Sequence, residues 1–212
     1  MSQSQFDHLT PIQKFLAWEA SPDTLCVGVK DSKQEELGNY ISSTSLDRYF
    51  GSQQVVREIL DALLPETQPD LYYVGKHYRY CLAILLSIHQ GPMIHHFIEY
   101  PSLKDQLLPF PRDPPIDFPV SSEIDLFAAF YDRQWRYLPT QLMYKMRGPL
   151  SPHTILPFQI LERLGRGRSA KIYKIQVDEE YNALHHPVRE ACATVHDPLS
   201  RSAVHVGHRL NA

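Results

Sequence analysis

Apolar side chains recur every three or four residues in several stretches of the first 140 residues, which is the spacing of an amphipathic helix. Helix start and stop residues flank these stretches: Thr10-Pro11 before the first, Pro65 after the second and Gly91-Pro92 after the third. The pattern therefore predicts helices over 11–20, 52–64, 71–90 and 93–100, and a fifth that starts at a Ser122-Glu123-Ile124-Asp125 capping box.

One hydrophobic core should hold these helices together. The stretch after Asp70 is expected to be a single helix. We expect this helix to lie at the centre of the core, because its second half is almost wholly apolar. The residues expected to be buried together are Val56, Ile59, Leu60, Leu63, Leu82, Leu85, Phe127, Tyr131 and Trp135.

A different pattern begins at Phe158. Apolar and polar residues alternate over 159–177 on both sides of a short glycine-containing segment, which predicts a β-hairpin. A short strand is also expected at Thr24–Lys30. Residues 101–119, which precede the predicted hairpin, hold six prolines. These prolines exclude a continuous helix or central strand and indicate an extended connection.

These patterns predict an α+β chain. A mainly α-helical N-terminal region, a small helical bundle, is expected over residues 1–150, and the hairpin lies within 158–184. The boundary is placed in the proline-containing segment 148–157. Residues 185–212 contain no Phe, Tyr, Trp or Lys and hold five of the eleven histidines, so we expect a disordered tail that buries too little apolar surface to offset its ordering entropy.

Composition narrows the classes of partner. The 212 residues carry 21 Lys and Arg against 24 Asp and Glu, so the formal charge is −3 and the chain is not a strongly basic nucleic-acid binder. Five basic residues do fall between Arg163 and Lys174, but acidic residues follow them and no run of aromatics accompanies them. We interpret them as the solvated charges of an exposed hairpin and expect no nucleic-acid partner.

No membrane or metal partner is expected either. The longest apolar run, residues 81–88, is far shorter than the roughly 20 residues that span a bilayer, and the N-terminus lacks the features of a secretory signal. The cysteines are too far apart for a zinc or redox motif, and no Cys or His lies four residues after His95 or His96. An intracellular location, cytoplasmic or nuclear, is expected.

The segment 158–184, FQILERLGRGRSAKIYKIQVDEEYNAL, carries the most informative motif. Its glycine pattern is Gly165-x-Gly167-x-x-Ala170-x-Ile172, with Leu164 ahead of the first glycine. The segment resembles the glycine-rich loop and first two strands of a eukaryotic-type protein kinase domain, with Ala170 in place of the third glycine. The run from about Tyr49 to Leu184 is also similar to the N-terminal extension and kinase start of fungal protein-kinase-like proteins.

The resemblance implies a nucleotide site for ATP with Mg²⁺. The implied nucleotide-binding residues are Leu164, Gly165, Gly167, Ala170 and Ile172. In the family, the glycines let backbone N–H groups approach the phosphates, and the residue at the position of Ile172 caps the adenine ring. A kinase also needs a third-strand lysine, an HRD-type loop and a DFG aspartate, but Lys174 is the last lysine of this chain. We therefore expect a truncated kinase-like protein of the serine/threonine type, without catalytic residues, that binds ATP weakly or not at all. The alternative is a non-enzymatic helical module that binds another protein through residues 52–138.

Overall fold

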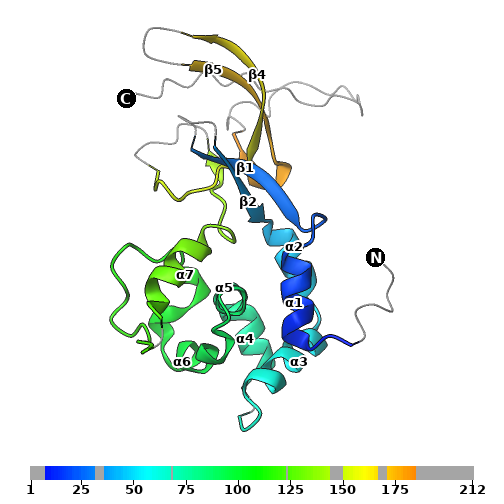
Figure 1. Ribbon diagram of the computed structural model, residues 1–212, viewed down its shortest axis with the longest axis vertical. Coiled ribbons are helices and arrows are strands. Elements are labelled where there is room, and N and C mark those ends of the chain that lie inside the picture. Colours follow the sequence, from blue (N-terminus) through cyan, green and yellow to red (C-terminus); the bar gives the residue numbers. More distant parts are fainter. Residues whose placement is uncertain are drawn as a thin grey trace, which may run out of the picture. The chain divides into compact units, whose positions relative to one another are not determined.

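The computed structural model describes residues 8–31, 36–67, 69–122, 124–143, 150–166 and 171–184. These described residues divide into two compact units, one within 1–26 and 39–139 and the other within 27–38 and 140–184. The described residues contain seven α-helices and three two-stranded sheets, so the α+β class predicted from the sequence is confirmed (Figure 1).

The first unit is helical. Its α-helices are α1 (Pro11–Glu19), α2 (Ser43–Phe50), α3 (Gln53–Leu63), α4 (Leu71–His77), α5 (Arg79–Ser87), α6 (Ile94–Glu99) and α7 (Leu126–Gln134). Short 3-10 turns η2 (Gly91–Met93), η3 (Pro101–Leu103) and η4 (Asp105–Leu107) connect some of them. The expected start of α1 is confirmed in detail, because Thr10 and Gln13 form a reciprocal capping box.

Helix α5 lies at the centre of this unit, where it packs against α1, α6 and α7 (Figure 1). All residues from Cys81 to Ser87 are buried, as expected for a helix that is apolar on every side. Of the nine residues predicted to share the core, five are buried in it: Val56, Ile59, Leu60, Leu82 and Leu85. Leu63 and Phe127 only pack against its edge, Tyr131 is half-buried, and Trp135 is buried outside this cluster.

The prediction of one helix over residues 71–90 is wrong. The chain leaves helical geometry at Tyr78, where φ is −136° and ψ is 18°, and α5 starts afresh at Arg79. The side chain of Asp105 accepts hydrogen bonds from the backbone N–H groups of Tyr80 and Cys81 at 3.0 and 2.9 Å. An acceptor from outside the helix thus satisfies donors of the new first turn, which allows the break.

The predicted capping box at Ser122 is also wrong. Helix α7 begins after Asp125, whose carboxylate accepts the N–H of Ala128 at 3.0 Å. It ends at Gln134, where the side chain forms two hydrogen bonds with the backbone of Phe110. The proline-rich segment forms no long helix or strand, as expected, but it contains η3 and η4 and inserts Phe110 and Phe118 into the core.

Two elements of this part of the chain were not predicted. Ser42 caps α2 by accepting the N–H of Ser45, and Leu46 and Phe50 bury one side of this helix. Strand β2 (Glu36–Ile41) pairs with β1 (Leu25–Asp31), the strand expected at Thr24–Lys30.

The second unit is built from short strands. Strand β3 (Leu142–Met143) pairs in parallel with β6 (Asn182–Ala183), and β4 (Phe158–Arg166) pairs antiparallel with β5 (Lys171–Val177). An isolated bridge joins Val29 to Leu156, with backbone bonds of 2.9 and 2.8 Å. Gly28 permits this approach, because any Cβ at position 28 would overlap the carbonyl oxygen of Leu156. The tail predicted at 185–212 lies outside the described residues.

Candidate functional site

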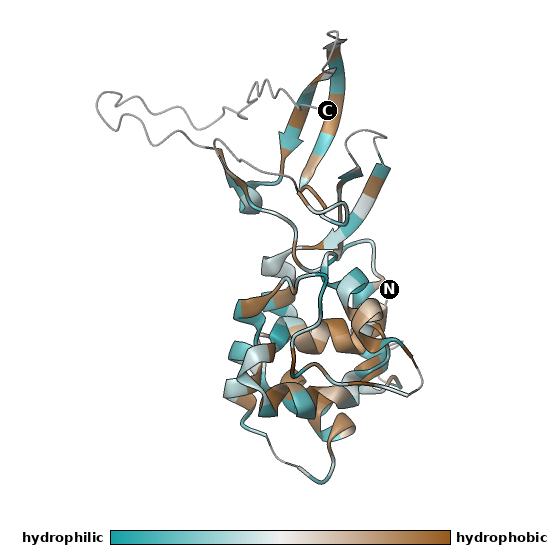
Figure 2. Cartoon of the chain, turned by 90° about the vertical axis from the view of Figure 1, so that its left-hand side faces the viewer, coloured by the Kyte–Doolittle hydropathy of each residue, from teal (hydrophilic) through white to brown (hydrophobic). Residues whose placement is uncertain are grey.

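The hairpin predicted at 159–177 is present as β4 and β5, and it carries the candidate site. Its register starts at the base with Phe158 opposite Val177 and Ile160 opposite Ile175. Side chains alternate between the two faces along each strand, and apolar and polar residues alternate correspondingly in Figure 2. The face that bears Phe158, Ile160, Tyr173, Ile175 and Val177 is half-buried.

Two irregularities in β4 change which residues meet near the tip. Leu161 and Leu164 are each left out of the pairing, so that Glu162 lies opposite Lys174 and Gly165 opposite Ile172. A regular ladder continued from the base would instead put Arg163 opposite Ile172 and Gly165 beyond the end of β5. The irregularities therefore bring the first glycine of the motif beside an aliphatic side chain.

The structure places three of the five predicted nucleotide-binding residues close together. Leu164, which precedes Gly165 in β4, is 45% exposed, and Ile172, which lies opposite Gly165 on β5, is 46% exposed. A Cβ built on Gly165 would have no neighbouring atom within 4 Å, so the space beside its backbone is open. Gly167 and Ala170, the other two, lie outside the described residues.

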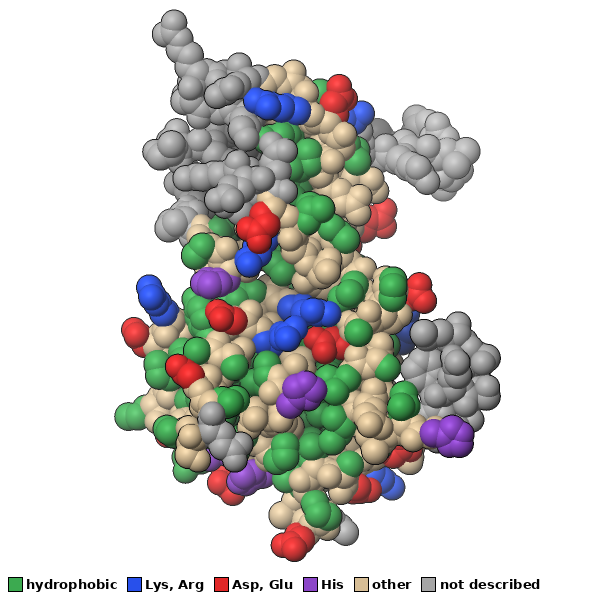
Figure 3. Space-filling model, viewed as in Figure 1, with side chains coloured by type: hydrophobic (Ala, Val, Ile, Leu, Met, Phe, Trp, Pro, Cys, Tyr) green, Lys and Arg blue, Asp and Glu red, His purple; other side chains and the backbone are tan. Residues whose placement is uncertain are grey.

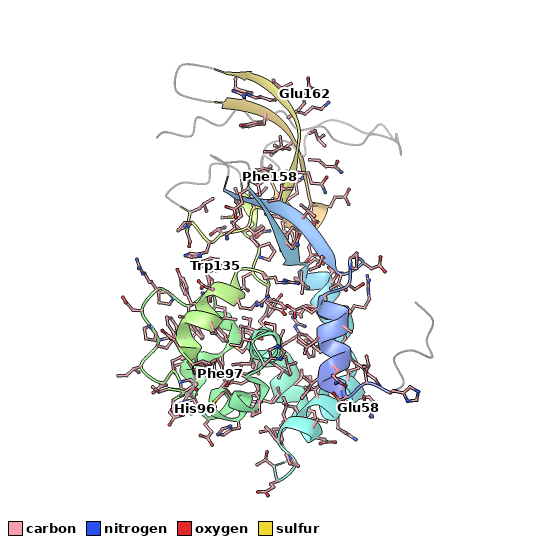
Figure 4. The ribbon with its side chains drawn as sticks, viewed as in Figure 1. Glu58, His96, Phe97, Trp135, Phe158 and Glu162 are labelled. Carbon is pink, nitrogen blue, oxygen red and sulfur yellow. The ribbon has the colours of Figure 1, made fainter. Side chains whose placement is uncertain are left out.

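Both positive and negative side chains lie near Leu164, Gly165 and Ile172. Lys174 and Glu162 face each other across the strands, an opposite-charge pair. Figure 4 labels Glu162 towards the tip and Phe158 at the base of the hairpin. On the face drawn in Figure 3, basic and acidic side chains of the described residues are interspersed rather than separated by sign.

In the helical unit, the buried thiol of Cys81 has a structural role. Its thiol donates to the carbonyl of Leu103 at 3.2 Å, and burial, followed by the nearby Asp105, raises the pKa of this thiol well above its usual value. Burial also raises the pKa of Asp105, although its hydrogen bonds from Cys81 and Tyr80 act in the opposite direction. A thiol with a raised pKa is a poor nucleophile, as expected from its apolar helix.

A second buried polar group lies where α1 meets the end of α7. Glu19 is buried, and its Oε1 lies 3.4 Å from Nε of Arg136 and 3.8 Å from Nη1 of Arg133. Nη2 of Arg136 also donates to the carbonyl oxygen of Glu19 at 3.2 Å. Burial, and then Glu19, raises the pKa of Tyr137. These ion pairs link the buried carboxylate at the end of α1 to arginines at the end of α7, although Oε1 of Glu19 and Nε of Arg136 form no hydrogen bond among the described residues.

The histidine pair on α6 also has a structural explanation. Nδ1 of His95 lies 2.8 Å from the carbonyl oxygen of Pro92, and Nε2 of His96 donates to the carbonyl oxygen of Asp117 at 2.8 Å. In the part of the chain that the structure describes, no group of three or more metal-ligating side chains comes together. None of the described helices has the length and apolarity needed to cross a bilayer.

One feature of the helical unit was missed by the sequence reasoning. Ile116 is 98% exposed and Val120 is 95% exposed, whereas Phe118 between them is 8% exposed. Phe118 packs against a group of aromatic rings: Phe97, Phe110, Phe127 and Phe130. The nearby prolines at 114, 115 and 119 signal an irregular segment, but nothing in the sequence separates the buried Phe118 from its exposed neighbours.

Comparisons of the chain with protein-family models, with curated proteins and with solved structures found no match.

Proposed function

We propose that residues 158–184 form the nucleotide-facing hairpin of a protein-kinase-like lobe and that this chain does not by itself transfer phosphate. The pairing of Gly165 with Ile172, beside the exposed Leu164, is the observation that carries the proposal. By the resemblance, the two aliphatic side chains contact adenine while the open backbone at Gly165 approaches the phosphates.

The charges of the hairpin support the proposal that this chain does not transfer phosphate by itself. Phosphoryl transfer depends on charges that position and stabilise the phosphates. Lys174 lies opposite Glu162 on the second strand of the hairpin, and no lysine follows it in the 212 residues that could hold the α- and β-phosphates. The nucleotide is then bound mainly through apolar contact with adenine, which gives a Kd of about a millimolar or weaker.

Alanine variants on the hairpin test the nucleotide-facing role. ATP binding with Mg²⁺ should weaken about tenfold in Leu164→Ala or Ile172→Ala, because each removes apolar contact with the base. Leu161→Ala is the matched control, since Leu161 lies on the same strand, is left out of the pairing in the same way and is 52% exposed. Equal losses in Leu161→Ala and Leu164→Ala, or no binding by the parent chain at several millimolar ATP, would refute this role.

A second function, binding of another protein by the helical unit, is favoured by the segment 115–120. The N–H of Phe118 donates to the carbonyl of Pro115 at 2.9 Å, and the hydroxyl of Ser102 donates to the carboxylate of Asp117. Together with the buried ring of Phe118, these bonds hold Ile116 in an ordered turn, and the side chains of Ile116 and Val120 on either side of Phe118 are almost fully exposed. Preorganised apolar side chains lose little entropy when a partner covers them.

Photo-crosslinking can test this second function. A photoreactive residue at 116 or 120 should crosslink one protein in cells, whereas the same residue at the exposed position 106 of η4 should not. The captured protein must then bind the purified chain and lose affinity for the Ile116→Ser variant. Identical crosslinks from positions 106 and 116 would argue against a specific surface.

A further inference from the structure

The exposed side chains of Ile116 and Val120 lie in an acidic stretch of the chain. Residues 112–125 contain one basic residue, Arg112, and four acidic residues, which are Asp113, Asp117, Glu123 and Asp125. One positive and four negative charges give this stretch a net charge of −3, the same as the net charge of all 212 residues. The rest of the sequence is therefore balanced, and the excess negative charge lies beside these two aliphatic side chains.

The structure describes three of these four carboxylates. Asp113 is exposed three residues before Ile116, Asp117 is half-buried between Ile116 and Val120, and Asp125 is exposed at the start of α7. Consecutive Cα atoms lie about 3.8 Å apart, so the backbone at Asp113 and Asp117 is within about 12 Å of that at Ile116. This separation is close to the distance of about 8–10 Å over which salt screens a charge. A partner that covers Ile116 therefore meets the charges of Asp113 and Asp117.

Few positive groups oppose them. Arg112 is exposed directly before Asp113. Nε2 of His96 lies 2.8 Å from the carbonyl oxygen of Asp117, which brings α6 against the segment. One turn further along α6, Glu99 is exposed and adds another negative charge. Acidic side chains thus outnumber basic ones among the described residues near this surface.

We propose that Ile116 and Val120 dock into an apolar pocket of a partner protein whose rim carries lysine and arginine side chains. This inference rests on the second function proposed above, binding of another protein by the helical unit. The aliphatic side chains supply the apolar contact, and the surrounding carboxylates attract a basic rim and repel an acidic one. The same charges disfavour nucleic acid, an anionic lipid surface and a second copy of this chain.

The photo-crosslinking experiment described above supplies the probe for the first test. The protein captured from position 116 or 120 is purified, and mass spectrometry locates the crosslinked peptide. That peptide should belong to an apolar pocket with lysine or arginine at its edge. The association rate of the purified pair should fall about tenfold between about 50 and about 300 mM NaCl, because charges at the edge of an interface act mainly on association.

Charge variants give a test with opposite signs. Asp113→Lys should slow association severalfold, whereas Arg112→Glu should speed it, since both residues are exposed and change the charge beside Ile116 in opposite directions. A merely structural disturbance would slow association in both. Asp61→Lys is the matched control and should leave the rate nearly unchanged, because Asp61 is exposed on α3, which packs mainly against α1, α2 and α4.

The outcomes separate this inference from the function on which it rests. No specific crosslink from positions 116 and 120 would refute both. A specific partner whose association is insensitive to salt and to the charge variants, or is slowed by both variants, would refute the basic rim alone. Capture of a second copy of this chain would also overturn the inference. So would binding to phosphatidylserine-containing vesicles that is lost in Ile116→Ser.

Discussion

Oδ1 of Asp105 accepts a hydrogen bond from the backbone N–H of Cys81 at 2.9 Å, although the two residues are 24 positions apart in the sequence. Oδ2 of the same carboxylate accepts from Tyr80 at 3.0 Å. A side chain in the turn η4 therefore caps the central helix α5, whose own preceding residues supply no side-chain cap. This long-range cap links the proline-rich segment to the core of the helical unit.

Replacing this cap should destabilise the helical unit. Asp105→Asn keeps one acceptor oxygen and loses the other, so we expect the free energy of unfolding to fall by about 1–2 kcal/mol. Burial raises the pKa of Asp105, so between the unfolded and folded pKa values the folded chain holds a proton that the unfolded chain has released. This contribution to stability is fully present below the unfolded pKa and is lost as the pH rises through the folded pKa.

Urea unfolding of both chains from about pH 4 to pH 7 measures both effects. The parent should lose more stability than Asp105→Asn as the pH rises. Parallel pH profiles for the two proteins would show that the carboxyl of Asp105 does not titrate differently in the folded state.

Shortening a buried side chain of α5 should lower the free energy of unfolding more than Asp105→Asn does. Leu85 is fully buried among the residues of the core, so Leu85→Ala should lower the free energy of unfolding by about 2–5 kcal/mol. Leu107→Ala, in the exposed part of η4, is the control and should change it by less than about 0.5 kcal/mol. If thermal denaturation shows the same melting temperature for Leu85→Ala and the parent, the core assignment is incorrect.

In the segment 115–120, substitutions at Phe118 and Ile116 should have opposite consequences for stability. Phe118→Ala removes a ring from the aromatic group and should cost about 3–5 kcal/mol, whereas Ile116→Ser should leave stability nearly unchanged. Chemical denaturation of both variants gives the comparison. A large loss in Ile116→Ser would mean that Ile116 is covered within the chain and is not available to a partner.

We also expect no phosphotransfer from this chain. Incubation with labelled ATP, Mg²⁺ and generic protein substrates should give no more product than a heat-denatured control, because the 212 residues contain no lysine after Lys174 and no HRD or DFG motif. Transfer that disappears in a Gly165→Val variant would contradict the expectation.

Local patterns were sufficient to predict most helices and the hairpin. The capping box at Thr10 and the alternation over 159–177 depend on residues close in sequence, and both are found in the structure. The break at Tyr78 could not be predicted in this way, because it is stabilised by Asp105 from a distant turn. The sequence does contain a pattern for α2, namely the capping residue Ser42 followed by Leu46 and Phe50 at helical spacing. This helix has only eight residues, so the pattern is short.

The candidate site was only partly predictable, because the placement of its residues depends on how the two strands pair. The glycine motif identified Leu164, Gly165 and Ile172, but their relative placement depends on the two irregularities at Leu161 and Leu164. Strand alternation alone does not reveal such irregularities, because they depend on how the twisted strands pack. The exposure of Ile116 and Val120 depends likewise on which proline-flanked residue enters the aromatic core.

Titration of the ¹⁵N-labelled chain with ATP and Mg²⁺, followed through the backbone amide signals of Gly165 and Gly167, tests the central claim most directly. A hairpin that faces the nucleotide but lacks its phosphate ligands should show almost no shift at micromolar ATP. Shifts that begin near millimolar ATP and centre on these glycines and Ile172 are the predicted result, equivalent to roughly −4 kcal/mol of binding free energy. Saturation at micromolar ATP would reveal a complete nucleotide site, and the absence of any shift at these residues would show that the hairpin does not face a nucleotide.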